Sequence, residues 1–261
     1  MRWTLFVLSV ATACLGAGEA DGIRRIGLDG TSRQCGPAEE AGKDGFARIK
    51  KLDEPLLELY PATSAHHPGN GTVIVSPGGG YGGLAVGHEG REVAKWLNQE
   101  GWDAAVLLYH VSAGEHTREL ALGDAKAALH LVKTRGDQCG LSTRKIGAIG
   151  FSAGGHLSAR LAHEAPLDFL ALIYPAYLDE NGNCREEVEP VHGPVFLYVA
   201  EDDKHAPASF AYAAACAEKG ILCVFHHPAL GGHGFGLKPD RSESVRVWPE
   251  KFRNFLTALS K

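Results

Sequence analysis

Several features are missing from this sequence, and each absence excludes a class of protein. No run of lysine and arginine occurs, and the net charge is -5 with a pI near 6.2, so there is no electrostatic footprint for nucleic acid. No apolar run approaches the roughly 20 residues that cross a bilayer, which argues against a membrane span. Internal repeats and low-complexity tracts are absent too. With 44% hydrophobic and 22% charged residues, the 261-residue chain is typical of one compact domain.

The cysteines also lack a metal-binding pattern. No CxxC motif and no cysteine–histidine spacing typical of a metal site is present, so we expect neither a metal nor a cofactor. Of the 6 cysteines, Cys14 lies near the amino terminus and the others are Cys35, Cys139, Cys184, Cys216 and Cys223. The five cysteines that follow Cys14 are an odd number, which leaves at least one thiol unpaired, and the sequence does not decide between buried thiols and a single bridge.

The first 20 residues, MRWTLFVLSVATACLGAGEA, have the shape of a signal peptide. One arginine precedes an apolar run from Leu5 to Ala13, and small residues follow. We therefore predict that residues 1–20 are a signal peptide and that the protein is secreted or periplasmic. Lipid attachment at Cys14 is the alternative, although Ala11 is a poor match to the larger aliphatic residue of such sites.

Residues 46–261 alternate between short apolar runs and helical patterns. Near-continuous apolar runs are typical of interior strands of a parallel sheet, and they cover residues 72–76, 104–109, 146–151, 169–174, 195–200 and 222–226. Helical spacing marks segments between and after them, of which the last places Trp248, Phe252, Phe255 and Leu259 on one face. The predicted fold is α/β, a mostly parallel central sheet covered by helices on both faces, with no large cap domain.

Two irregular segments complete this division of the chain. Residues 21–45 show no sustained period and many turn formers, so we expect an extended, partly disordered lead-in to a catalytic domain at 46–261. Residues 178–194 are the longest irregular piece inside that domain. We expect them to border the active site.

A serine stands in a glycine-rich turn after one of the predicted strands. Residues 149–155 are IGFSAGG, in which Gly150 and Gly154 leave room for a sharp strand-to-helix bend that presents the Ser152 hydroxyl. The competing interpretation is an ordinary glycine-rich junction. A nucleophile is favoured only if a base, an orienting acid and an oxyanion site follow other strands.

Loops after the other predicted strands supply those groups. The stretch PGGGYGGLA at 77–85 lets backbone N–H groups of Gly79 or Gly80 approach a ligand oxygen, together with that of Ala153. Asp203 lies in EDDKHAP at 201–207, and His233 lies in a glycine-lined loop before the last helix. Active-site residues in open α/β sheets gather at the carboxyl ends of the strands.

The order Ser152, Asp203, His233 is that of the α/β-hydrolase arrangement. In this chemistry His233 removes the serine proton and later returns it, and the aspartate holds the imidazole in the right tautomer. We expect Asp203 rather than Asp202 in that role, because neighbours leaving a strand point in different directions.

Four stretches, SPGGGYGGLA, GFSAGGHLSARLA, AEDDKHAP and GGHGFGL, resemble small α/β-hydrolase esterases grouped with bacterial acetyl-xylan and feruloyl esterases, some of which carry a xylanase label. The resemblance covers roughly residues 46–260. It implies the α/β-hydrolase fold, Ser152 as nucleophile, Asp203 as acid, His233 as base, and oxyanion contacts at Gly79, Gly80 and Ala153. Two departures are Pro77, where related enzymes often have histidine, and Ala206, where they often have valine.

The predicted function is a secreted serine esterase that removes short acyl groups, acetyl or feruloyl, from plant-type polysaccharides or oligosaccharides. The loops around the predicted site are glycine-rich or polar and suit a carbohydrate or other small ester, with Tyr81 and Phe235 available to stack on a sugar ring. The alternatives are a prolyl-oligopeptidase-like peptidase, for which the chain is short, and a catalytically silent binding module. The sequence does not determine an oligomeric state.

Several other polar residues are expected to be structural. His156 follows the serine by one helical turn and is expected to pack or form a hydrogen bond within its helix. Asp124 is expected to cap or bridge structure. The pairs His66 with His67 and His226 with His227 lack the companions of a metal site.

Overall fold

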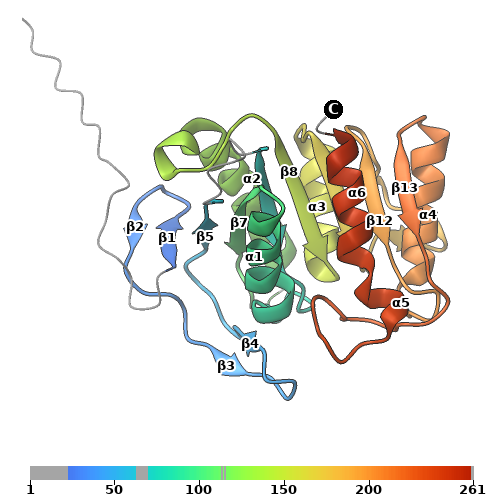
Figure 1. The fold of residues 1–261 in the computed structure, drawn as a ribbon, viewed down its shortest axis with the longest axis horizontal. Helices are drawn as coiled ribbons and strands as arrows, with labels where there is room; N and C mark the ends of the chain where they lie inside the picture. Colours follow the sequence, from blue (N-terminus) through green and yellow to red (C-terminus); the bar gives the residue numbers. More distant parts are fainter. Residues whose placement is uncertain (1–22, 63–69, 113, 115, 260–261) are drawn as a thin grey trace, which may run out of the picture.

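The computed structural model describes residues 23–62, 70–112, 114 and 116–259 (Figure 1). The predicted signal peptide, Cys14 and the pair His66 and His67 lie outside these residues. In the described ranges, no helix combines the length and the apolar character needed to span a membrane.

A nine-stranded sheet forms the centre of the described part of the chain, in the order β13-β12-β9-β8-β6-β7-β5-β1-β2. Its strands are β1 (Arg24–Gly27), β2 (Ser32–Arg33), β5 (Leu56–Tyr60), β6 (Thr72–Ser76), β7 (Asp103–Leu108), β8 (Ile146–Phe151), β9 (Phe169–Ile173), β12 (Val195–Tyr198) and β13 (Cys223–His226). The six neighbouring strands β13, β12, β9, β8, β6 and β7 are parallel to one another. The pairs β7–β5, β5–β1 and β1–β2 are antiparallel. The predicted mostly parallel sheet is confirmed.

The interior strands are buried along their whole length, which explains why near-continuous apolar runs predicted them. Every residue of β6, β7, β8 and β9 is buried. Both faces of these strands are covered, so no alternation between apolar and polar residues remains in their sequences. Each of the six apolar runs predicted as strands coincides with one of the parallel strands to within two residues at either end.

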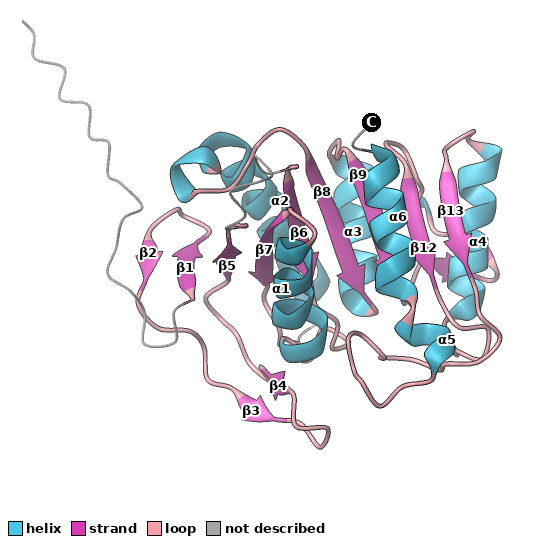
Figure 2. Ribbon diagram, viewed as in Figure 1, coloured by secondary structure: helices cyan, strands magenta, loops and turns pink. Residues whose placement is uncertain are grey.

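Helices lie on both faces of the sheet, as Figure 2 shows. They are α1 (Glu92–Gln99), α2 (Thr117–Arg135), α3 (Ala153–Glu164), α4 (Ala206–Glu218), α5 (Glu243–Arg246) and α6 (Trp248–Leu259), with short helical turns η1 (Gly87–Arg91), η2 (Asp137–Cys139) and η3 (Glu186–Val188). Helices α1 and α6 share one face, where the ring centroids of Trp96 and Trp248 lie 5.9 Å apart. Helices α2 and α3 pack together on the other.

Residues 23–45 contain regular structure that the sequence did not predict. Strands β1 and β2 extend the central sheet, and β3 (Glu40–Ala41) pairs with β4 (Ala47–Arg48) in a separate hairpin. Ile26 of β1 lies opposite Leu57 of β5, and the Arg25 guanidinium forms a buried ion pair with Glu58 at 3.0 Å. These strands form because β5 offers an open edge, which a short sequence window does not reveal. The expected partly disordered lead-in is therefore corrected to an ordered edge of the sheet.

The carboxyl ends of the parallel strands meet at one edge of the sheet, at the bottom of the view in Figure 1. The hairpin β3–β4 and helix α5 lie at the same edge. Hence a segment near the amino terminus and the loop before the last helices are both close to the strand ends where the active site was expected.

The five cysteines that the structure describes are thiols without a disulfide bond.

Candidate active site

Ser152 occupies the sharp turn between β8 and α3 and has a backbone conformation that L-residues rarely adopt. Its φ is 52° and its ψ is -117°. The turn is possible because its neighbours are glycines: a Cβ at Gly154 would overlap the backbone carbonyl of Ser76, and a Cβ at Gly150 would overlap that of Gly154. Strained backbone of this kind persists where the surrounding structure enforces it, often at functional sites.

The structure brings together the three residues that the sequence placed far apart. The His233 Nε2 atom lies 2.8 Å from Ser152 Oγ, and its Nδ1 atom lies 2.6 Å from Asp203 Oδ2. The Asp203 side chain is fully buried, and its Oδ1 atom accepts a hydrogen bond of 2.9 Å from the His205 N–H. The three side chains thus form one continuous chain of hydrogen bonds.

The state of Asp203 decides where the proton on His233 lies. Burial alone would raise the pKa of Asp203, but hydrogen bonds from His233 and from the His205 N–H outweigh it and lower the pKa below its usual value. An ionised carboxylate can only accept, so His233 Nδ1 carries the proton and donates it. The Nε2 atom is then free to accept the Ser152 hydroxyl proton, as a general base requires.

The glycine loop after β6 lies against the serine. A Cβ atom placed on Gly78 would lie only 2.9 Å from Ser152 Cβ, so the loop has no room for a side chain there. Gly79 and Gly80 have positive φ values of 142° and 66°. Among the described residues, no hydrogen bond uses the N–H of Gly79 or Gly80. Ala153 is the first residue of α3, whose N–H has no acceptor within its own helix. These N–H groups are available to an oxyanion beside Ser152.

Glu89 connects the loops that carry the site, although the sequence interpretation did not single it out. Its Oε2 atom accepts the Gly78 N–H at 2.8 Å, and its Oε1 atom accepts the Tyr174 hydroxyl at 2.8 Å. The Tyr174 oxygen in turn accepts the Gly236 N–H at 2.8 Å. Burial opposes ionisation of Glu89, but contacts with His88, Tyr174 and Gly78 lower its pKa overall. A glutamate in a stretch of mixed polar residues gives no local signal for this role.

Tyr81 and Phe235 do not line the cavity, which corrects the expectation that they stack on a sugar. Tyr81 is 5% exposed and its hydroxyl lies 2.7 Å from His156 Nδ1. Phe235 is 1% exposed, and its ring centroid lies 4.3 Å from that of Tyr174. Both rings are already covered by the core, so neither can offer a face to a ligand. His156 is a packing residue as expected, but it bonds to Tyr81 rather than within its helix.

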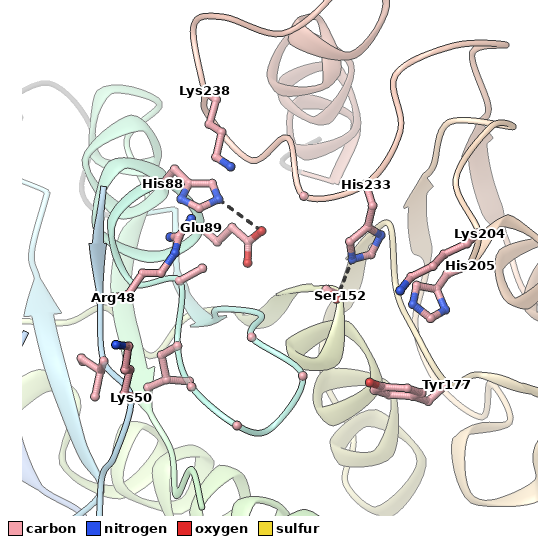
Figure 3. Close-up of a pocket in the computed structure, with 18 residues that line it drawn as sticks. Arg48, Lys50, His88, Glu89, Ser152, Tyr177, Lys204, His205, His233 and Lys238 are labelled. Carbon is pink, nitrogen blue, oxygen red and sulfur yellow. Dashed lines mark hydrogen bonds and ion pairs between the residues drawn. The ribbon is translucent and has the colours of Figure 1, made fainter. Parts of the chain in front are cut away.

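A cavity of about 480 Å³ opens beside Ser152 and His233 (Figure 3). Gly79, Gly80, Tyr177 and His205 belong to its wall. Tyr177 is an aromatic wall residue that the sequence interpretation missed. The segment 178–194, with β10 (Asp179–Glu180) and β11 (Asn183–Cys184), packs on α4 and does not line this cavity, so the expectation that it borders the site is wrong except for the adjoining Tyr177.

The remaining polar residues have structural partners. Asp202 does not reach His233, and its Oδ1 atom accepts the Gly232 N–H at 2.7 Å. Asp124 accepts the N–H of His110 at 2.8 Å and bridges two segments, as expected. Within the described residues, no group of three or more His, Cys, Asp or Glu side chains is arranged to hold a metal ion.

Comparison with known proteins gives relatives among ester hydrolases. The family model BD-FAE matches residues 57–189. An acetylxylan esterase from Xylanibacter ruminicola is 27% identical over 208 residues, which are 66% of this chain and 42% of that protein. The chain therefore spans less than half the length of the curated relatives it matches.

Solved structures show the same fold. The acetyl ester-xyloside bifunctional hydrolase from Caldicellulosiruptor lactoaceticus is 26% identical with a TM-score of 0.69, and the match covers 90% of this chain and 96% of that one. The carboxylesterase Cest-2923 from Lactobacillus plantarum has a TM-score of 0.65 at 18% identity, covering 86% and 98% of the two chains. The predicted α/β-hydrolase fold is confirmed, and the two solved structures named here are hydrolases by their own descriptions.

Proposed function

The chain belongs to the BD-FAE family of α/β-hydrolases, and from this premise we propose that it is a serine esterase that removes short acyl groups, acetyl or feruloyl, from plant-type polysaccharides or oligosaccharides. The observation that carries the proposal is the hydrogen-bonded chain Ser152–His233–Asp203, with the serine at the wall of an open cavity.

The geometry supports acyl transfer in two halves. Ser152 Oγ attacks the ester carbonyl while His233 Nε2 takes its proton, and the carbonyl oxygen becomes an oxyanion facing the N–H groups of Gly79, Gly80 and Ala153. Collapse of this intermediate breaks the bond to the alcohol, which leaves with the proton from His233. Water then attacks the acyl-serine by the same route, so that the products are a carboxylic acid, an alcohol and free enzyme.

The cavity wall supports a short acyl group. It is built largely from glycines and polar side chains, with Ile49, Leu84 and Ala85 as its aliphatic members. A long acyl chain needs extended apolar surface, whereas a sugar needs hydrogen-bond partners and an aromatic face such as that of Tyr177. The acetylxylan and acetyl ester-xyloside activities named for two relatives agree with this substrate class. We propose secretion on the strength of residues 1–20 alone.

Active-site labelling combined with ester kinetics tests the proposal. A fluorophosphonate should label the wild type at Ser152 and leave Ser152→Ala unlabelled, while Ser209→Ala, which removes a buried serine of α4, keeps full labelling. The wild type should cleave p-nitrophenyl acetate with a higher kcat/KM than p-nitrophenyl octanoate, and it should release acetate from acetylated xylan. A Ser152→Ala enzyme with a tenth of wild-type activity would exclude Ser152 as nucleophile, and a preference for octanoate would exclude the short-acyl assignment.

A further inference from the structure

The cavity beside Ser152 has an excess of positive charge. Four basic side chains, those of Arg48, Lys50, Lys204 and Lys238, line it together with one carboxylate, Glu89. This is a local reversal in a chain with a net charge of -5. Glu89 is buried and already accepts hydrogen bonds from Gly78 and Tyr174, so it is committed to the protein and not to a cationic ligand.

Two of these cations share a single carboxylate. Asp44 Oδ2 lies 2.6 Å from an Arg48 nitrogen and 2.8 Å from Lys238 Nζ. The hydrogen bond from Lys238 is the main reason that the pKa of Asp44 lies far below its usual value. One negative charge cannot compensate two positive ones. Arg48 Nη1 is buried and has no hydrogen-bond partner among the described residues, and the side chains of Asp44, Arg48 and Lys238 together carry one net positive charge at the cavity wall.

The other two lysines differ in their surroundings. Lys50 forms an exposed ion pair with Glu40 and is therefore compensated. Lys204 has no ion pair within the described residues and stands next to His205. Figure 3 shows Arg48, His88 and Lys238 on one side of Ser152, with Lys204, His205 and Tyr177 on the other. An ester seated at Ser152 has a basic group on each side.

A purely structural role does not require this arrangement. Asp44, Arg48 and Lys238 hold the β3–β4 hairpin against the loop after His233, but a single cation opposite Asp44 would suffice for that contact. The Lys238 side chain is only 9% exposed, so its charge is kept in a partly desolvated place where an anion interacts with it more strongly than in water. Arg and Lys placed together at a cavity wall are the side chains that bind carboxylates.

We propose that the enzyme prefers esters of acidic sugars, in which a carboxylate on the sugar binds beside Arg48 and Lys238 while the acyl carbonyl lies at Ser152. This inference rests on the proposed esterase function and narrows its substrate class to uronic-acid-containing carbohydrate. Lys204 on the opposite side adds to the positive potential that attracts such a substrate.

The test compares an acidic and a neutral sugar ester of the same shape. Acetate release should be measured from an acetylated methyl glucuronoside and from the corresponding methyl glucoside, in which a hydroxymethyl group replaces the carboxylate. We expect a kcat/KM ratio in favour of the acid of about tenfold at low ionic strength, falling severalfold as salt screens the charges. This measurement on the wild type needs no variant to fold.

Variants then locate the effect. Arg48→Gln should lower the acid-to-neutral ratio of kcat/KM towards one, whereas Lys95→Gln, which removes the same charge from an exposed pair with Glu92 outside the cavity, should keep the wild-type ratio.

Equal kcat/KM for the two sugar esters in an enzyme that cleaves p-nitrophenyl acetate would overturn the inference and leave the esterase proposal intact. A preference for the p-nitrophenyl monoester of succinic acid over the butyrate, without a preference between the sugars, would also overturn it, since the carboxylate would then belong to the acyl group. Failure to cleave any ester would overturn the proposed function itself.

Discussion

Replacing Asp203 by asparagine should lower kcat/KM by about 10³ to 10⁴, because the amide holds His233 in the wrong tautomer. The structure determines which way the amide lies. In the wild type, one carboxylate oxygen accepts the His205 N–H at 2.9 Å and the other accepts His233 Nδ1–H at 2.6 Å. An asparagine side chain has only one acceptor atom, its amide oxygen. This oxygen accepts the backbone N–H of His205, because the position of that N–H is fixed.

The amide NH₂ group then faces His233 and donates to Nδ1. The imidazole proton moves to Nε2, which can no longer accept the Ser152 hydroxyl proton over the 2.8 Å contact. The expected loss corresponds to about 4 to 5 kcal/mol of transition-state stabilisation. The side chain keeps its size and remains buried, so the fold and the melting temperature should change little.

Asp202→Asn is the matched control for this prediction. Within the part of the chain that the structure describes, the Asp202 carboxylate accepts one hydrogen bond, from the Gly232 N–H at 2.7 Å, and an amide oxygen can replace that acceptor. The assay is kcat/KM for p-nitrophenyl acetate in both variants, with circular dichroism to check folding. Equal losses in the two variants, or a larger loss in Asp202→Asn, would refute the assignment of Asp203 as the residue that orients His233.

Three further predictions concern the surroundings of the site. Glu89→Gln should lower kcat by about tenfold to a hundredfold and leave KM within about twofold. Gly78 and Tyr174 donate to different oxygens of Glu89, and an amide has only one oxygen, so one contact is lost and the oxyanion loop shifts. An unchanged kcat in a folded variant would contradict this. Burial, with the charges of Arg118 and Arg160, lowers the pKa of His156 from 6.5 to about 3, so below pH 6.5 the unfolded chain binds a proton that the native state does not. The contribution of His156 to the free energy of unfolding should therefore fall by about 1.4 kcal/mol for each unit by which the pH is lowered from 6.5 to about 3. Denaturant titrations should show a shallower loss of stability with falling pH in His156→Gln than in the wild type. Gly154→Ala should destabilise the fold by about 3 kcal/mol, because the new Cβ overlaps the Ser76 carbonyl. Gly123→Ala in α2, where a Cβ meets nothing within 4 Å, should stabilise the fold by about 0.5 to 1 kcal/mol. Similar melting temperatures for the two variants would argue against a tight turn at Ser152.

Short-range rules were enough to predict the candidate catalytic residues that the structure brings together. The parallel strands are buried on both faces, so their apolar runs were visible without any knowledge of their partners. The elbow at Ser152 depends on sterics between residues a few positions apart. Asp203 and His233 were predicted as partners of Ser152 because parallel strands end at the same edge, which makes the loop after each strand a candidate for the site.

Only the tertiary structure decided which side chains surround those groups. Tyr81 lies within the glycine loop and Phe235 follows His233 by two residues, yet both rings point into the core, because the direction of a loop side chain depends on the backbone turns around it. Strand β1 exists because β5, about thirty residues further along the chain, offers its edge. Glu89 and Arg48 reach the site through contacts with Gly78 and with Asp44 beside Lys238. The contacts between Asp44 and Lys238 and between β1 and β5 join segments that are distant in the chain. Such contacts leave no period or motif in either segment, and therefore they become visible only when the chain is folded.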